Sequence, residues 1–173
     1  VVYGTGYAYS PWIGSVWSED VEGTNGIGTC VAEQRAVVVH RRQHFRMRHA
    51  VLSCTAAPIF DPEGGLIAAL DISSIDPIRS EHSHALSLPL IEAAAHTLEE
   101  RLFRDRYGKA WVIALAAPVD DKPMALIAVD REQRIIGADR HTRAELGLSP
   151  EALSAGILLS SLFAHDRAPF RRH

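Results

Sequence analysis

The chain has 173 residues, of which 47% are hydrophobic and 23% are charged, and its formal net charge is −3. This composition is typical of a globular protein. It provides neither the strong positive charge of a surface that binds nucleic acid or anionic lipid nor an apolar run of the ~18 to 20 residues that a membrane span needs. The N-terminal VVYGTGYAYSPW also lacks the basic and apolar regions of a secretory signal. Cys30 and Cys54, both in apolar surroundings, predict buried, reduced thiols in a cytoplasmic protein.

The first distinctive stretch is WSEDVEGTNGIGT, from Trp17 to Thr29. Its glycines follow the spacing G-x-x-G-x-G, which matches neither the dinucleotide-binding pattern nor the P-loop, and no apolar strand precedes them. The glycines therefore indicate a tight turn and a close backbone approach where a helix begins. The helical spacing of Ile27, Cys30 and Val31 predicts that helix from about residue 25 to 34, with Thr24 or Asn25 as its N-cap.

A hairpin is predicted next. The β-branched run 36–40 and the apolar segments 51–60 and 66–73 are typical of strands, and the DPEGG turn joins the last two. Between the first two strands, the basic segment 41–49 predicts a short helix or a loop, whose arginines are solvated or paired with nearby acids.

A long helix is predicted from about residue 83 to 107, and Gly108 ends it. Its apolar residues follow a spacing of alternately three and four, typical of a heptad seam. The members of the seam are Leu88, Ile91, Ala95, Leu98 and Leu102. A seam about two heptads long fits either a stripe that faces the core or the interface of a homodimer, and both alternatives stay open.

The last third predicts a second α+β module. An apolar segment at 111–118 precedes two strands at 125–130 and 134–139, which a tight turn joins. A helix at 140–148 closes at Gly147, and a further helix begins with Ser149 as its N-cap and Pro150 in its first position.

Catalytic and metal chemistry finds little support in the sequence. Glu19, Asp20 and Glu22 are close in sequence, but acids at the start of a helix are favoured by its dipole and need no further role. The histidines do not follow zinc-site spacing. An iron site built from His44, Cys54 and a nearby acid remains an alternative. We therefore expect no catalytic residue, no metal ion and no cofactor, and a protein that is not an enzyme.

Four segments, taken together and in this order, resemble the GAF domain of sigma-54-dependent transcriptional activators, in the subgroup of the acetoin catabolism regulator. They are Trp17-Ser18-Glu19, Gly23 to Thr29, Gln43-His44-Phe45, and Cys54 through Ser73. The resemblance covers about residues 13–107, and it departs at Gln43, where the subgroup usually has Glu. Residues 125–153 resemble the start of a PAS domain.

The resemblance implies an α+β fold: a GAF-like, six-stranded antiparallel sheet with helices, a long linking helix, and then the start of a PAS-like module. Residues 1–107 would form the GAF-like domain, with its N-terminal part missing, and residues 108–173 a linker and the first part of the PAS-like domain. The resemblance also implies a ligand pocket lined by Trp17, Glu19, Thr24, Asn25, His44, Phe45 and Cys54.

By the same resemblance, a small-molecule effector would control an ATPase domain and a DNA-binding domain that this chain lacks. The chain would form a homodimer away from any membrane, and the whole protein would act on sigma-54 RNA polymerase and DNA. The alternative is a structural dimerisation module without a ligand, in a signalling protein such as a histidine kinase.

Overall fold

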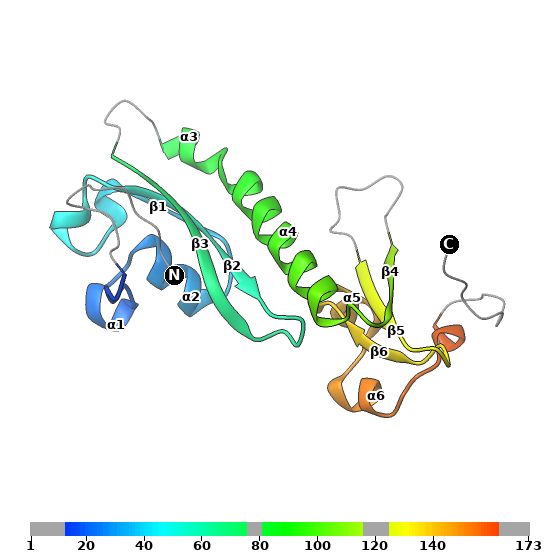
Figure 1. Ribbon diagram of the computed structural model, residues 1–173. Helices are drawn as coiled ribbons and strands as arrows, with labels where there is room; N and C mark the ends of the chain where they lie inside the picture. Colours follow the sequence, from blue (N-terminus) through cyan, green and yellow to red (C-terminus); the bar gives the residue numbers. More distant parts are fainter. Residues whose placement is uncertain (1–12, 76–80, 116–124, 163–173) are drawn as a thin grey trace. The chain divides into compact units, whose positions relative to one another are not determined.

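The computed structural model describes residues 13–75, 81–115 and 125–162 (Figure 1). The chain divides into two compact units. Unit 1 comprises residues 1–59 and 66–95, and unit 2 comprises residues 60–65 and 96–173. Each unit contains an antiparallel sheet with helices packed around it, so the predicted α+β class is confirmed.

Unit 1 begins with two short helices, α1 (Glu19–Glu22) and α2 (Gly26–Glu33). Asn25 is the N-cap of α2, because its Oδ1 accepts a hydrogen bond of 2.8 Å from the N–H of Gly28. The helix ends at Gln34, which adopts the left-handed conformation with φ 51°. The predicted helix is confirmed. Of the two residues predicted as its possible N-cap, Asn25 is the one that caps it.

The sheet of unit 1 has the strand order β1-β2-β3. Its strands are β1 (Val37–His40), β2 (Ser53–Phe60) and β3 (Leu66–Ser74). β1 runs antiparallel to β2, with Val37 opposite Ala56. The turn after β2 closes with a 2.8 Å hydrogen bond from the Asp61 N–H to the Gly65 carbonyl, as expected for the predicted hairpin. Within unit 1, the described residues thus form a three-stranded sheet, where the resemblance implies six strands.

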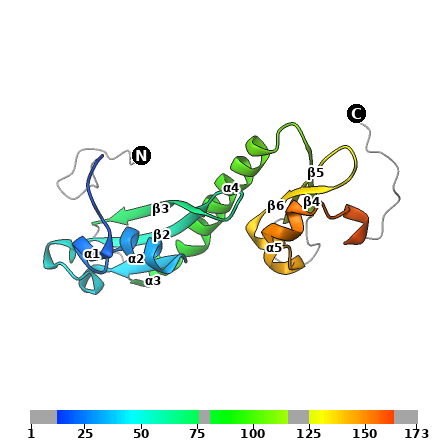
Figure 2. The same cartoon turned by 90° about the horizontal axis from the view of Figure 1, so that it is seen from below.

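The central strand is covered on both faces, because neighbouring residues of a strand point to opposite sides. Cys54 faces α2: a Cβ on Gly26 would lie 2.5 Å from the Cys54 Cβ. Thr55 faces the other way, and its Oγ1 donates to the carbonyl of His84 in α3 (Glu81–Ala85) at 3.3 Å. Figures 1 and 2 show α2 and α3 on opposite faces of this sheet.

The predicted long helix is interrupted. α3 ends at Ala85, and α4 runs from Leu88 to Arg106. The cause is Pro89: it has no N–H for the carbonyl four residues earlier, and its ring is tolerated only in the first turn of a helix. The prediction of one continuous helix over residues 83–107 was therefore wrong, and Pro89 is the residue that contradicts it.

The predicted seam does not form one continuous exposed face. Ile91 and Ala95 are buried in the chain's own fold, with 1% and 3% exposure. Leu98 is 41% exposed, whereas Leu88 and Leu102 are partly buried. The first part of α4 therefore packs against the core through Ile91 and Ala95.

Unit 2 is built around a second antiparallel sheet of order β4-β5-β6. Its elements are β4 (Trp111–Leu115), β5 (Ala125–Val129), β6 (Ile135–Ala138), α5 (Arg140–Leu146), α6 (Pro150–Ser154) and a 3-10 turn, Leu159–Ser161. Phe103 of α4 packs with Leu126 and Ala128. The predicted Gly147 terminus and Ser149 cap are confirmed. In the described parts of the chain, no helix is both long and apolar enough to cross a membrane.

Candidate functional site

The loop before α2 is held by one buried side chain. Asn25 is 1% exposed. Its Nδ2 donates to the carbonyls of Trp17 at 2.9 Å and Gly23 at 2.8 Å, while its Oδ1 caps α2 through Gly28. Because both amide protons are used inside the protein, Asn25 is a clamp that fixes Trp17 over the start of the helix.

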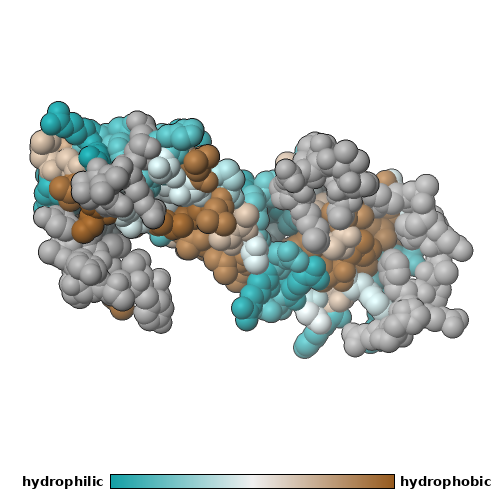
Figure 3. Space-filling model, turned by 90° about the horizontal axis from the view of Figure 1, so that it is seen from above, coloured by the Kyte–Doolittle hydropathy of each residue, from teal (hydrophilic) through white to brown (hydrophobic). Residues whose placement is uncertain are grey.

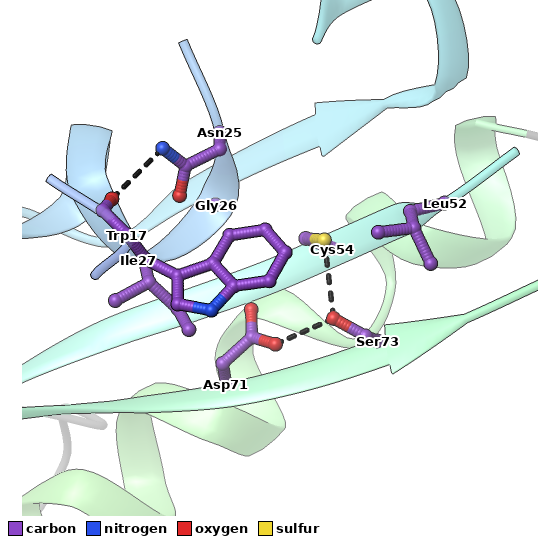
Figure 4. A pocket seen from close by; sticks show the side chains of 8 residues that line it. All are labelled: Trp17, Asn25, Gly26, Ile27, Leu52, Cys54, Asp71 and Ser73. Atoms are coloured by element: carbon purple, nitrogen blue, oxygen red, sulfur yellow. Dashed lines mark hydrogen bonds between the residues drawn. The ribbon is translucent and has the colours of Figure 1, made fainter. Parts of the chain in front are cut away.

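A small pocket lies between this loop, the start of α2 and the strands β2 and β3 (Figure 4). The lining residues are Trp17, Asn25, Gly26, Ile27, Leu52, Cys54, Asp71 and Ser73. The volume open to a water-sized sphere is about 10 Å³, close to what one water molecule needs. A ligand of several heavy atoms therefore requires part of the lining to move.

The floor of the pocket carries a chain of polar side chains. The Ser73 hydroxyl donates to Asp71 Oδ2 at 2.6 Å, and Ser73 Oγ lies 3.1 Å from Cys54 Sγ. On its other side, Cys54 Sγ lies 3.4 Å from His44 Nε2. His44 Nδ1 is 2.9 Å from the carbonyl of Arg41 and therefore carries the ring proton, so Nε2 accepts from the thiol.

Burial sets the protonation of these groups. Desolvation, with the negative charge of Asp71 as a smaller cause, raises the pKa of the Cys54 thiol to about 12. Burial also lowers the pKa of His44, although the hydrogen bond to the Arg41 carbonyl opposes that effect. At neutral pH the pair is a thiol and a neutral imidazole, and Cys54 is a hydrogen-bonding group without thiolate character.

Asp71 is the exceptional group of the site. Burial raises the pKa of its carboxyl to about 6, even though the hydrogen bond from Ser73 lowers it. Its Oδ1 atom is buried and has no hydrogen-bond partner. A buried acceptor without a donor is costly, so this oxygen marks the place in the pocket where a ligand's donor would be most favourable.

Comparison with known proteins identifies the family of this chain. The GAF domain family matches residues 2–102. The chain belongs to the GAF domain family. It is 36% identical over 159 residues to the acetoin catabolism regulatory protein of Cupriavidus necator, a match covering 88% of this chain and 24% of that protein. It is 27% identical over 134 residues to the acetoin dehydrogenase operon transcriptional activator AcoR of Bacillus subtilis, covering 77% of this chain and 22% of that protein.

The chain thus spans about a quarter of the length of these curated relatives. Among solved structures, the crystal structure of the E. coli DhaR(N)-DhaL complex aligns with a TM-score of 0.47 and 19% sequence identity, over 84% of this chain and 50% of that chain. The predicted resemblance to the GAF region of acetoin-type regulators is confirmed by the family match and by the two regulatory relatives.

The GAF domain brings three of the seven predicted pocket residues to the pocket wall: Trp17, Asn25 and Cys54. His44 is 4% exposed and lies directly behind Cys54. Phe45 points away and is 71% exposed, because the backbone at His44 is extended and successive side chains then alternate in direction.

Glu19 and Thr24 lie outside the pocket wall. The Glu19 carboxylate accepts a short hydrogen bond from the hydroxyl of Thr29, which ties α1 to α2. Thr24 is exposed, and its carbonyl accepts from the N–H of Phe45 at 3.0 Å. Both residues hold the loops of the GAF domain around the pocket.

The basic segment of the GAF domain is tied to α1. Glu22 accepts hydrogen bonds from Arg48, and Arg46 donates to the carbonyl of Val21 at 2.6 Å. The ring of His49 stacks on Trp17 with a centroid distance of 4.9 Å. Arg46 and Arg48 therefore pair locally, as one of the sequence interpretations expected, and the neighbouring His49 packs on the tryptophan.

Sequence reasoning missed five lining residues: Gly26, Ile27, Leu52, Asp71 and Ser73. A signal for Asp71 was present, because it is a charged residue in the middle of the apolar strand segment LIAALDIS. Charged side chains are rarely buried without a partner or a role. No such sequence signal pointed to the other four residues, Gly26, Ile27, Leu52 and Ser73.

Proposed function

We propose that this chain is the small-molecule-sensing region of a sigma-54-dependent transcriptional activator, with the pocket beneath Trp17 as its effector site. The observation that carries the proposal is the buried, unpartnered Oδ1 of Asp71 in that pocket. Membership of the GAF family and the regulatory relatives support it. The ATPase and DNA-binding activities would belong to other parts of a full-length cytoplasmic protein, and unit 2 would be the start of a PAS-like module.

The pocket chemistry favours a small, uncharged effector that donates a hydrogen bond. Asp71 supplies an acceptor and an unfavourable field for anions, while the wall of Trp17, Ile27 and Leu52 is apolar. Two relatives are named for acetoin metabolism. Acetoin, a four-carbon hydroxyketone, combines a hydroxyl donor with apolar methyl groups and is the first compound to test.

The experiment is calorimetric titration of the chain with acetoin and with its diketone analogue, which lacks the hydroxyl donor. We expect acetoin to bind more tightly than the diketone. Asp71→Ala should weaken acetoin binding by at least about tenfold, as expected for a hydrogen bond to a charged group, and should leave the diketone unaffected. Equal binding of both compounds, or acetoin binding that Asp71→Ala does not change, would contradict this assignment.

We further propose that the sensing region is a homodimer through the exposed side of α4. With Ile91 and Ala95 buried, a dimer that preserves the fold would use exposed leucines at and before this helix: Leu86, Leu90 and Leu98, at 68%, 67% and 41% exposure. Figure 3 shows apolar surface patches on the face it displays. Native mass spectrometry of the purified chain reports copy number and any co-purified effector together, and Leu90→Glu should convert a dimer to a monomer.

The alternative, a dimerisation module without a ligand, predicts a different outcome of the same measurements. The dimer would form, and neither acetoin nor another small hydroxy compound would bind. The unpartnered carboxylate oxygen of Asp71 favours the sensor, since a purely structural module has no use for that destabilising group.

A further inference from the structure

A cluster of side chains of the types that can bind metal ions lies in unit 2, and none of them lines the pocket. His96 and Glu99 come from α4, and His141 comes from α5. One ligand atom of each lies within 4.8 Å of those of the other two. All three side chains are partly buried.

The backbone brings two of these groups together for a simple reason. Residues three apart on a helix share a face, and His96 Nδ1 lies 3.3 Å from Glu99 Oε2. The other carboxylate oxygen, Oε1, accepts a 2.9 Å hydrogen bond from the N–H of Phe60. Glu99 is thus oriented by a neighbouring backbone group, in the way that outer-shell hydrogen bonds orient metal ligands.

The third group arrives from a distant part of the sequence. His141 is the second residue of α5, and its ring centroid lies 5.0 Å from that of His96 at an interplanar angle of 63°. The N-cap of α5, Asp139, accepts from the N–H of Thr142 at 2.7 Å and so fixes the first turn. Three elements therefore converge on one point: α4, α5 and the end of β2 at Phe60.

We propose that His96, Glu99 and His141 form a binding site for one divalent transition-metal ion of the zinc class. Two imidazole nitrogens and one carboxylate oxygen make a three-ligand set, which leaves a further coordination position for water or a second ligand. The site differs from the His44 and Cys54 alternative raised by the sequence, and it lies outside the effector pocket.

One neighbour opposes the proposed ion. A terminal nitrogen of Arg140 lies 3.5 Å from His141 Nε2, and its guanidinium carbon lies 4.0 Å from the centroid of the Phe60 ring. Its Nε is buried without a hydrogen-bond partner. A metal ion would repel this positive charge, so removal of the charge should strengthen metal binding.

The test is calorimetric titration of zinc chloride into the whole chain after removal of metals with a chelator. We expect one zinc ion per chain. His141→Ala and Glu99→Gln should each reduce affinity by more than the roughly 10–100-fold that loss of an outer-shell partner costs. The matched controls are His82→Ala, an exposed histidine, and Glu100→Gln, the neighbouring acid that pairs with Arg104; both should bind zinc like the parent chain.

Arg140→Gln keeps all three ligands and serves even if the other variants fail to fold. It should bind zinc about tenfold more tightly, because a nearby positive charge is gone. Cobalt(II) provides a second measurement, since its visible absorption should appear with the parent chain and disappear with His141→Ala. The absence of stoichiometric zinc binding, zinc binding that is unchanged in His141→Ala and Glu99→Gln, or unchanged affinity in Arg140→Gln would overturn the proposal. The cluster would then be a helix-surface ion pair with a stacked histidine.

Discussion

Replacement of Asp71 by asparagine removes the negative charge of this partly buried side chain while it keeps the size of the side chain. Burial raises the pKa of the Asp71 carboxyl from an ordinary 3.8 to about 6 in the folded protein. Because the folded state binds this proton more tightly, the contribution of Asp71 to stability is complete at low pH and is lost as pH rises through about 6. At neutral pH the loss amounts to roughly 3 kcal/mol, from 1.36 kcal/mol for each pH unit of the difference.

The measurement is denaturant unfolding of both proteins, followed by tryptophan fluorescence, at several pH values. The useful quantity is the free energy of unfolding of Asp71→Asn minus that of the parent chain. It should increase by about 2 kcal/mol between roughly pH 4.5 and pH 7.5. The difference is needed because other groups also make stability depend on pH. His44, His49 and His141 have lowered pKa values, so their contribution to the free energy of unfolding is lost as pH falls, opposite to that of Asp71. These contributions are common to both proteins and cancel in the difference.

A difference that stays constant over this pH range would refute the reasoning, because Asp71 would then titrate alike in the folded and unfolded chains. A difference that falls with rising pH would refute it more strongly, since the carboxylate would then be stabilised by the fold. Either result would also remove the observation on which the proposed effector site depends.

Two further predictions concern the loop that closes the pocket. Gly26→Ala should destabilise the chain by about 1–3 kcal/mol through overpacking, since the new Cβ would lie 2.5 Å from the Cys54 Cβ; Gly108→Ala, where the nearest atom is 3.5 Å away, is the control for chemical denaturation. Asn25→Ala should cost about 2–4 kcal/mol, because a cap is lost and two carbonyls lose their buried donor. Ser149→Ala, which removes the cap of α6 but no comparable clamp, should cost about 1 kcal/mol, and equal losses in both variants would show that the clamp is unimportant.

Local structure was largely predictable from the sequence, because its signals are local. The β-branched run, the DPEGG turn and the Gly147 terminus each specify a conformation through neighbouring residues, and the structure follows them. The interruption before α4 was equally local, since Pro89 forbids a continuous helix. The heptad spacing alone could not distinguish a stripe that faces the core from a dimer interface, because both have the same period.

The site was only partly predictable, because its geometry depends on pairs that are distant in sequence. The resemblance supplied Trp17, Asn25 and Cys54. It could not show that Asp71 on β3 lies beside Cys54 on β2, which depends on how the two strands align and on the close approach of α2. For the same reason no sequence pattern joined His141 to α4, since their contact exists only in the folded unit.

Under the proposed function, the position of Trp17 on the pocket wall indicates how an effector would act. The space is sufficient for about one water molecule, so part of the lining would have to move, and displacement of the Trp17 indole would enlarge the pocket. That ring stacks on His49, and its backbone carbonyl is held by the Asn25 clamp that also caps α2. Displacement of the ring would break the stack, while a donor to Asp71 Oδ1 would satisfy a buried acceptor. A state with the ring displaced would then have to bind the effector more tightly than the closed state, which is the condition that any ligand-driven switch must satisfy.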